Sequence, residues 1–267
     1  NKLDFTKKRL FLFDIDGTLA VGDSLLPGAR ALLDAIAARG GVSLFITNNS
    51  TRSQMDYVRR FQRVFGLETT ADQFVTASVV AAQALRARYG AQTIYAQGTD
   101  SFVRELRTFG LQVTTEAAAQ PACVVVGYDS ELTYEKLCRT AEILQRTGAP
   151  FYGTNPDLRC PAPFGFIPDC GAICGMLAAT VGREPVYLGK PSARVVEACL
   201  AQTGCTPDET LVVGDRLYTD IACGLHAGVD TCLFLTGEAR MEDLEATPFP
   251  PGAVLDGPDV LLHRLEA

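Results

Sequence analysis

Histidine and basic residues are scarce in this sequence. Two of the 267 residues are histidine, His226 and His263. A histidine-rich metal site or a histidine nucleophile is therefore hard to build. Acidic residues number 31 and basic residues 24, which gives a net charge of −7. Because no surplus of lysine and arginine is left to neutralise the phosphates of a nucleic acid, we expect no nucleic-acid polymer among the partners.

Long apolar stretches and paired cysteines are absent as well. No run of about 18 apolar residues occurs, so we expect no membrane span. The apolar run 10–13 is too short for a signal peptide. The nine cysteines are odd in number and none is spaced as C-x-x-C, which indicates reduced thiols and a cytoplasmic protein. Cys170 and Cys174 suit packing on one face of a helix, and sharing a metal is the alternative.

The sequence does contain an alternation of short apolar runs and helical patterns. Its length suits two domains, and 47% hydrophobic with 21% charged residues is ordinary for a globular protein. Near-continuous apolar strands separated by helices predict an α/β fold with a parallel sheet covered on both faces. Strands are expected at 10–13, 42–46, 186–188, 211–213 and 231–235, and helices at 27–38, 53–65, 192–202 and from about 219.

The middle of the chain has the pattern of a second α/β unit. Here we expect strands at 93–96, 113–115, 123–126 and 150–152, and helices at 101–109, 134–146 and 172–181. We predict that this unit is inserted into the first one. The predicted bounds are 1–78 and 184–267 for the first domain and 79–183 for the inserted domain.

Polar residues of a similar kind follow several predicted strands of the first domain. Asp14 follows the strand at 10–13, Thr47 and Asn48 follow the strand at 42–46, and Asp215 follows the strand at 211–213. Lys190 comes directly after another apolar strand. In an open parallel sheet, ligands bind outside the carboxyl ends of the strands. We therefore expect these residues to converge on one pocket.

Each of these residues has a more ordinary interpretation. Asp14 and Asp16 could simply be polar loop residues, although a carboxylate directly after four apolar residues is poorly placed for a solvated face. Together with Asp215 they supply the oxygen ligands that a hard cation prefers. Thr47 alone could cap the next stretch, and Lys190 could be an exposed loop lysine. Asp220 could be an ordinary acidic residue in the first turn of a helix.

The motifs resemble those of the haloacid dehalogenase (HAD) superfamily, within its NagD-like, p-nitrophenylphosphatase-type subfamily. The first motif is the segment Asp14-Ile15-Asp16-Gly17-Thr18, the second is Thr47, the third is Lys190, and the fourth is Asp215 with Asp220. The resemblance covers essentially the whole chain. It implies a Rossmann-like doubly wound parallel core with an inserted α/β cap of type C2.

The resemblance also implies a magnesium-dependent phosphomonoester hydrolase that works in two steps. Asp14 is the expected nucleophile, which becomes an aspartyl phosphate. Asp16 is expected to protonate the leaving oxygen and then to deprotonate the attacking water. The expected ligands of Mg²⁺ are the carboxylates of Asp14 and Asp215 and the backbone carbonyl of Asp16.

The remaining motif residues are expected to bind the phosphoryl group. Thr47 and Lys190 would hold its equatorial oxygens, where charge is spread in the transition state. Asn48 is a further candidate for this contact. Asp220 is expected to orient Lys190 or a metal-bound water.

The inserted cap should select the leaving group. Segments 127–134 and 154–157 also resemble the subfamily, and they make Asp129, Asn155 and Asp157 candidates for substrate contact. The alternative is turn formation, since Asn and Asp beside Gly or Pro are common in turns. Segment 168–172 departs from the Pro-Gly-Ala-Gly-like stretch of the subfamily. The physiological substrate therefore stays open between nucleoside monophosphates, sugar phosphates and p-nitrophenyl phosphate.

Two other functions compete with hydrolysis. A phosphomutase or phosphotransferase would return the phosphoryl group to a substrate, but the gap 19–46 is too short for the helical cap of the familiar mutases. A non-enzymatic sensor of phosphorylated ligands would not need all of the motif residues.

The expected partner is a small phosphomonoester, and we expect no contact with a membrane. The resemblance is compatible with a homodimer.

Overall fold

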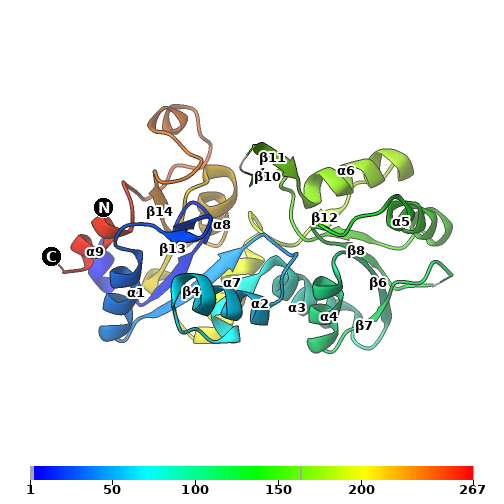
Figure 1. The fold of residues 1–267 in the computed structure, drawn as a ribbon, viewed down its shortest axis with the longest axis horizontal. Helices are drawn as coiled ribbons and strands as arrows, with labels where there is room; N and C mark the ends of the chain where they lie inside the picture. The colour runs from blue at the N-terminus through cyan, green and yellow to red at the C-terminus, as the bar shows by residue number, and fades with distance from the viewer. Residues whose placement is uncertain (1–2, 119, 163, 267) are drawn as a thin grey trace. The chain divides into compact units, whose positions relative to one another are not determined.

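The computed structural model describes residues 3–118, 120–162 and 164–266, which belong to two compact units (Figure 1). The first unit comprises Asn1–Thr47, Asp56–Val75 and Lys190–Ala267, and the second comprises Asn48–Met55 and Thr76–Gly189. Each unit contains a parallel sheet with helices, so the predicted α/β class is confirmed. Segment Asn48–Met55, which lies in the predicted core range 1–78, packs with the second unit.

The first unit is built on a six-stranded sheet with the order β15-β14-β13-β1-β4-β5. All residues of the central strands β1 and β13 are buried, because helices cover both faces of the sheet. Residues Leu10 and Phe13 of β1 pair in parallel with Thr210 and Val213 of β13. The strands are β1 (Leu10–Phe13), β4 (Val42–Thr47), β5 (Phe74–Thr76), β13 (Thr210–Gly214), β14 (Asp230–Phe234) and β15 (Ala253–Leu255).

Helices and one small hairpin complete the first unit. A two-stranded hairpin, β2 (Ala20–Val21) with β3 (Ser24–Leu25), follows β1 directly. The helices are α1 (Ala29–Ala38), α2 (Gln54–Arg60), α7 (Arg194–Thr203), α8 (Ala222–His226) and α9 (Pro258–Glu266). Two π-helical turns, η2 (Phe61–Phe65) and η5 (Leu217–Ile221), continue α2 and precede α8. Short 3₁₀ turns lie at η1 (Phe5–Lys7), η3 (Ala71–Gln73), η4 (Pro207–Glu209) and η6 (Met241–Glu245).

Aromatic packing fixes the edge of this sheet next to β4. The rings of Phe45, Phe61 and Phe74 are all buried, and their centroids lie 4.9 to 5.1 Å apart. Aromatic pairs at this spacing add to the stability gained from burial alone. This packing supports β4, whose last residue is Thr47.

The second unit is a five-stranded parallel sheet with the order β12-β9-β8-β6-β7. Its strands are β6 (Thr93–Gln97), β7 (Gln112–Thr114), β8 (Val124–Val126), β9 (Phe151–Gly153) and β12 (Val186–Tyr187). Its helices are α3 (Ala77–Tyr89), α4 (Asp100–Thr108), α5 (Tyr134–Thr147) and α6 (Cys170–Val181). An antiparallel hairpin, β10 (Arg159–Ala162) with β11 (Gly165–Pro168), precedes α6.

Hydrogen bonds attach segment Asn48–Met55 to the second unit. Ser50 Oγ accepts the backbone N–H of Tyr128 at 2.8 Å and lies 3.0 Å from Thr154 Oγ1. Thr99 Oγ1 donates to the carbonyl of Thr51 at 3.1 Å. Ser50 and Thr154 are fully buried, so these bonds are shielded from water. Thr47 is therefore the residue of the first unit at which the chain first enters the second unit. The chain returns to the first unit for Asp56–Val75, and Lys190 is the first residue after its final return.

The nine cysteines are free thiols. Cys170 and Cys174 lie on successive turns of α6 with their sulfurs 3.8 Å apart, and both are fully buried. Within the described ranges, no helix is both long and apolar enough to cross a membrane.

Candidate active site

Asp14 lies at the carboxyl end of β1, in the centre of the six-stranded sheet. Its backbone N–H donates to the carbonyl of Val213 at 2.9 Å, which continues the pairing of β1 with β13 by one residue. Its side chain is only 14% exposed. A carboxylate held this close to an apolar sheet needs cationic partners, because burial disfavours its charged form.

Lys190 is the nearest cationic partner of Asp14. Its Nζ lies 2.7 Å from Asp14 Oδ1 and 2.6 Å from Asp220 Oδ1, and it donates to the carbonyl of Ile46 at 3.3 Å. The side chain is 3% exposed. Burial alone would lower the pKa of Lys190, but the two carboxylates outweigh burial and raise it above its ordinary value. Lys190 is therefore a fixed positive charge beside Asp14.

Asp215 and Asp220 follow β13 and complete a cluster of three carboxylates. Asp215 is 2% exposed and Asp220 is 1% exposed. One oxygen from each of Asp14, Asp215 and Asp220 can be chosen so that all three lie within 4.8 Å of one another. Gly214 permits this arrangement, since a Cβ at that position would lie 2.2 Å from Cβ of Asp220.

Burial, together with repulsion between the carboxylates, raises the pKa values of Asp14 and Asp215. Burial, followed by repulsion from Asp220, raises the pKa of Asp215 to about 6. Burial also raises the pKa of Asp14 well above its ordinary value, although Lys190 opposes the shift. One ammonium group does not compensate three neighbouring carboxylates, so the cluster favours an additional positive charge.

The residues of the cluster fit a hard divalent cation. Buried carboxylate oxygens that approach one another within 4.8 Å are the donors that Mg²⁺ prefers. Burial and the neighbouring carboxylates raise the pKa values of Asp14 and Asp215, and the charge of such a cation would favour their ionised forms. The resemblance found in the sequence implied Mg²⁺, and this donor set is compatible with that expectation.

Asp16 lies apart from the carboxylate cluster. Its side chain is 55% exposed, and its Oδ1 is 3.8 Å from the guanidinium of Arg60. Arg60 also donates to the carbonyl of Gly22 in the β2–β3 hairpin at 2.7 Å and lies 3.8 Å from Asp23. Arg60 therefore connects α2 with the hairpin that follows Asp16. The prediction that the backbone carbonyl of Asp16 binds metal stays a prediction.

The predicted phosphate and substrate residues fall into two groups. Thr47 is buried at the end of β4, in the unit that contains Asp14. Asn48, Asn155 and Asp157 all lie in the second unit. There, Asp157 Oδ2 accepts the side-chain amides of Asn48 at 2.8 Å and Asn155 at 2.9 Å. Asn155 is fully buried and Asp157 is 7% exposed, so the three side chains hold segment Asn48–Met55 in place.

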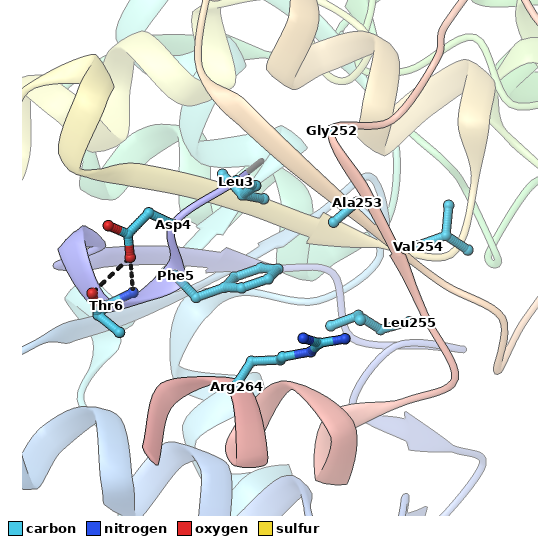
Figure 2. Close-up of a pocket in the computed structure, with 9 residues that line it drawn as sticks. All are labelled: Leu3, Asp4, Phe5, Thr6, Gly252, Ala253, Val254, Leu255 and Arg264. Carbon is cyan, nitrogen blue, oxygen red and sulfur yellow. Dashed lines mark hydrogen bonds between the residues drawn. The ribbon is translucent and has the colours of Figure 1, made fainter. Parts of the chain in front are cut away.

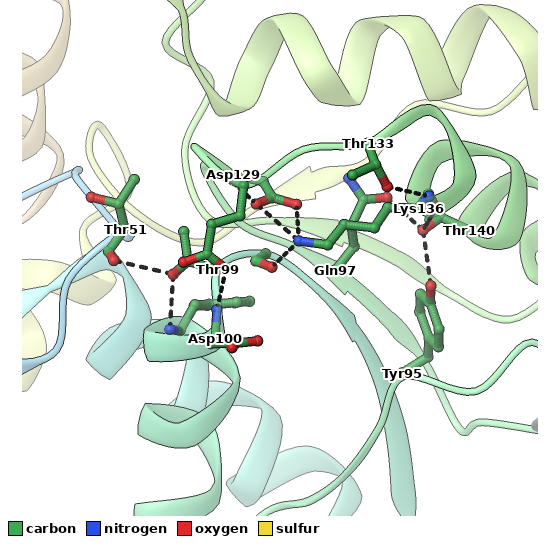
Figure 3. Close-up of polar contacts among 12 residues, drawn as sticks. Thr51, Tyr95, Gln97, Thr99, Asp100, Asp129, Thr133, Lys136 and Thr140 are labelled. Atoms are coloured by element: carbon green, nitrogen blue, oxygen red, sulfur yellow. Dashed lines mark hydrogen bonds and ion pairs between the residues drawn. The ribbon is translucent and has the colours of Figure 1, made fainter.

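Asp129, a candidate for substrate contact, is also occupied by contacts within the second unit (Figure 3). Lys136 Nζ lies 3.0 Å from Asp129 Oδ2 and donates to the carbonyl of Gly98 at 3.0 Å. The side chain of Asp129 is fully buried. Burial raises the pKa of Asp129, and the hydrogen bond from Lys136 opposes the shift. These contacts join the N-terminal turn of α5 to the end of β6.

The sequence interpretation missed one group of residues at the site, namely the segment Thr236–Glu238 after β14. The backbone N–H of Glu238 donates to Asp215 Oδ2 at 2.8 Å. Thr236 Oγ1 donates to the carbonyl of Gly17 at 2.6 Å. The signal was present, because polar residues follow this strand as they follow β1, β4 and β13.

Arg216 was also missed. Its Nε lies 3.0 Å from Glu238 Oε2, and its backbone N–H donates to Asp220 Oδ2 at 3.1 Å. Burial opposes the charged form of Arg216, but Asp14 and Asp220 raise its pKa above the ordinary value. The guanidinium thus stays charged at the edge of the carboxylate cluster. Its position directly after Asp215 was the available signal.

A separate cavity of about 400 Å³ in the first unit lacks these features (Figure 2). It lies beside the edge strand β15, and its charged lining residues are Asp4 and Arg264. The carboxylate of Asp4 is bound to the backbone and hydroxyl of Thr6. The cavity therefore offers no cluster of catalytic groups comparable to that around Asp14.

Comparisons with known proteins identify the family to which this chain belongs. The family model for haloacid dehalogenase-like hydrolases matches residues 11–112, and a HAD-hydrolase-like model matches residues 187–259. The acid sugar phosphatase of Staphylococcus epidermidis is 30% identical over 256 residues, which cover 96% of this chain and 97% of the relative. The ribonucleotide monophosphatase NagD of Escherichia coli is 33% identical over 238 residues, with coverage of 89% and 92%.

A solved structure is similar over almost the whole chain. The 4-nitrophenylphosphatase of Thermotoga maritima superposes with a TM-score of 0.92 at 34% sequence identity, and the match covers 98% of each chain. The two family-model matches include Asp14, Thr47, Lys190 and Asp215.

Proposed function

The chain belongs to the haloacid dehalogenase-like hydrolases as a phosphatase, and from this premise we propose that it hydrolyses small phosphomonoesters with Mg²⁺ through a phosphorylated Asp14. The observation that carries the proposal is the position of Asp14, buried at a strand end and bound to Lys190 at 2.7 Å. Sugar phosphates and ribonucleoside monophosphates are the proposed substrate class, since relatives carry both names. The free cysteines support a cytoplasmic location.

In the first proposed step, Asp14 attacks phosphorus. Its Oδ1 stays bound to Lys190, which leaves Oδ2 as the attacking atom. The bond from phosphorus to the ester oxygen breaks, and Asp16 donates a proton to that oxygen. The 55% exposed side chain of Asp16 suits this role, because a proton donor must reach both the leaving group and, later, water.

In the second proposed step, water attacks the phosphorus of the aspartyl phosphate. Asp16, now ionised, accepts the proton of that water, and Asp14 is released as a carboxylate. Phosphoryl transfer depends mainly on positioning and on compensation of charge. Lys190 supplies one part of this compensation once one of its three present contacts is exchanged for a phosphoryl oxygen.

The carboxylates of Asp14 and Asp215 and the carbonyl of Asp16 would hold Mg²⁺, whose charge offsets the repulsion between nucleophile and phosphate. Three carboxylates and one ammonium carry two net negative charges, and Arg216 is paired with Glu238. The charge of a divalent cation bound there would therefore balance these two negative charges. Thr47 stands at the neighbouring strand end as the proposed hydroxyl donor to the phosphate.

The direct test is phosphate release from 4-nitrophenyl phosphate, a sugar phosphate and a ribonucleoside monophosphate, with Mg²⁺ and with EDTA. We expect turnover that requires Mg²⁺ and disappears in Asp14→Asn. The matched control is Asp256→Asn, which makes the same change at an exposed position. Absence of turnover on all substrates with Mg²⁺ present, or full activity of Asp14→Asn, would refute the proposal.

A further inference from the structure

The carboxylate of Asp215 is enclosed by two glycines from different parts of the chain. A Cβ on Gly17 would lie 2.6 Å from Asp215 Oδ2, and a Cβ on Gly237 would lie 1.9 Å from the same atom. Real Cβ atoms do not approach other atoms this closely, so any larger residue at either position must displace the carboxylate. Gly17 belongs to the first motif, whereas Gly237 belongs to none of the four.

The neighbours of Gly237 bind the same group of residues. Glu238 donates its backbone N–H to Asp215 Oδ2 at 2.8 Å, and Ala239 donates to the backbone carbonyl of Asp215 at 3.0 Å. Thr236 Oγ1 donates to the carbonyl of Gly17 at 2.6 Å, next to Asp16. The other oxygen of Asp215 accepts the hydroxyl of Thr18 at 3.2 Å.

From these contacts we infer that segment Thr236–Glu238, at the carboxyl end of β14, is a positioning element that sets the affinity of the site for a divalent cation. The inference rests on the proposed function. Thr236 holds the carbonyl of Gly17, one residue after Asp16. Gly237 leaves room for the Asp215 carboxylate, and the backbone of Glu238 orients that carboxylate. Groups that orient metal ligands commonly change metal affinity by about 10- to 100-fold when they are altered.

The side chain of Glu238 extends this element towards Arg216. Its Oε1 accepts the hydroxyl of Tyr218 at 2.7 Å, and its Oε2 lies 3.0 Å from Arg216 Nε. The backbone bond to Asp215 and the side-chain bonds to Arg216 and Tyr218 therefore come from one residue. Glu238 joins the segment after β14 to the segment after β13 at Asp215, Arg216 and Tyr218.

The test measures cation binding without substrate. Mg²⁺ affinity is determined by calorimetry, and Mn²⁺ affinity by electron paramagnetic resonance, on Thr236→Val, Thr236→Ser and Gly237→Ala. We expect Gly237→Ala to weaken binding roughly tenfold or more. Thr236→Val should weaken it roughly fivefold, since one hydrogen bond is worth about 1 kcal/mol, and Thr236→Ser should restore it.

Two controls make the same chemical changes elsewhere. Thr210→Val removes a buried hydroxyl that donates to a backbone carbonyl at 2.8 Å, at the opposite end of β13. Gly175→Ala adds a methyl group in α6 where no atom lies within 4 Å. Both variants should bind the cations like the wild type, with thermal unfolding confirming that each variant is folded.

Wild-type affinity in folded Gly237→Ala and Thr236→Val would overturn the inference while the proposed function stands. If the wild type binds neither cation and releases no phosphate, the proposed function fails and the inference fails with it. If Gly237→Ala does not fold, the inference is tested by comparing the cation affinity of Thr236→Val with that of Thr236→Ser. The inference would also be overturned if Thr210→Val and Gly175→Ala lost as much cation affinity as the variants of this segment, because the effect would then not be specific to Thr236–Glu238.

Discussion

Lys190 and Asp14 are separated by 176 positions in the sequence, yet Lys190 Nζ lies 2.7 Å from Asp14 Oδ1. The same ammonium group lies 2.6 Å from Asp220 Oδ1. All three side chains are largely shielded from water. Each carboxylate therefore depends on a cation that it meets only in the folded protein, and this dependence can be measured.

Replacing Lys190 by Met should abolish phosphatase activity and destabilise the metal-free protein. Removing one partner of a buried ion pair leaves an uncompensated charge, which costs about 3–5 kcal/mol of the free energy of unfolding. The loss in free energy of unfolding should be smaller at pH 5 than at pH 7, because a protonated carboxylate no longer needs a cationic partner. Denaturant unfolding at pH 5 and pH 7 measures both values. The double variant Lys190→Met, Asp220→Asn should recover part of the free energy of unfolding that Lys190→Met loses. If the effects of the two substitutions on the free energy of unfolding simply add, the result would contradict an interaction between Lys190 and Asp220.

The carboxylate cluster also predicts how stability depends on pH. The pKa of Asp215 is about 6 in the folded protein, compared with an ordinary value of 3.8. Between these values the folded protein keeps a proton that the unfolded chain has released, so stability falls as pH rises through this window. A shift of this size corresponds to about 3 kcal/mol. The raised pKa of Asp14 acts in the same direction.

The Asp215→Asn variant tests this origin of the pH dependence. Without metal, it should be more stable than the wild type at pH 7 and lose less stability between pH 4 and pH 6. Added Mg²⁺ should raise the melting temperature of the wild type at pH 7 but not that of the variant. A metal-free wild type that loses no more stability from pH 4 to pH 6 than the variant would argue against a raised pKa of Asp215 as the origin of the pH dependence.

Asp16→Asn should separate proton transfer from cation binding. The side chain of Asp16 is more than half exposed and lies outside the carboxylate cluster, so its loss should change stability by no more than about 0.5 kcal/mol. The turnover rate should fall by about 10²- to 10⁴-fold, the usual contribution of an acid–base group. Calorimetry should show nearly unchanged Mg²⁺ affinity. Loss of cation binding in this variant would mean that its carboxylate is a ligand.

Asp157 offers a test between a structural and a substrate-binding role. Truncation to Ala removes the acceptor shared by the partly buried Asn48 and the fully buried Asn155, and a buried amide that loses its acceptor costs about 1–3 kcal/mol. Asp157→Asn keeps one acceptor oxygen and should cost less. Unfolding experiments and KM values on one substrate measure the two roles separately. A large rise in KM with unchanged stability would favour direct substrate contact.

The fold was predictable where one local pattern determined the structure. The fully buried strands β1 and β13 were expected within about one residue of their observed ends, because both are continuous apolar runs bounded by polar residues. The predicted helix 53–65 is instead an α-helix followed by a π-helical turn, η2. Helix α3 was missed, since its residues 77–82 are all buried and therefore show no alternation of polar and apolar positions.

Other elements depend on contacts that the sequence does not display. The two-residue strands β2 and β3 exist because the hairpin closes on itself, and their residues form no periodic pattern. Strand β15 pairs only at the edge of the sheet, next to β14. Segment Asn48–Met55 belongs to the second unit through long-range bonds such as that of Ser50 to Tyr128.

The site was predictable from strand ends, but its supporting contacts were not. Asp14, Thr47 and Asp215 each follow an apolar strand, so their convergence could be inferred from topology. The contact between Glu238 and Asp215 requires the order of β13 and β14 in the sheet, which the sequence does not specify. Likewise, the burial of Asn155 among its hydrogen-bond partners could not be read from its local Asn-Pro sequence.

The points at which the chain passes between its two units have a consequence for modular engineering. Thr47 and Lys190 are the residues of the first unit at two of these junctions. Exchange of the second unit between relatives would thus leave Asp14, Thr47, Lys190 and Asp215 in their own framework. The graft must carry Asn48–Met55 together with Thr76–Gly189, because Ser50 and Asn48 bind residues of the latter segment. A chimera that exchanges only Thr76–Gly189 would lose these hydrogen bonds, because Asn48 and Ser50 would then face residues of another protein.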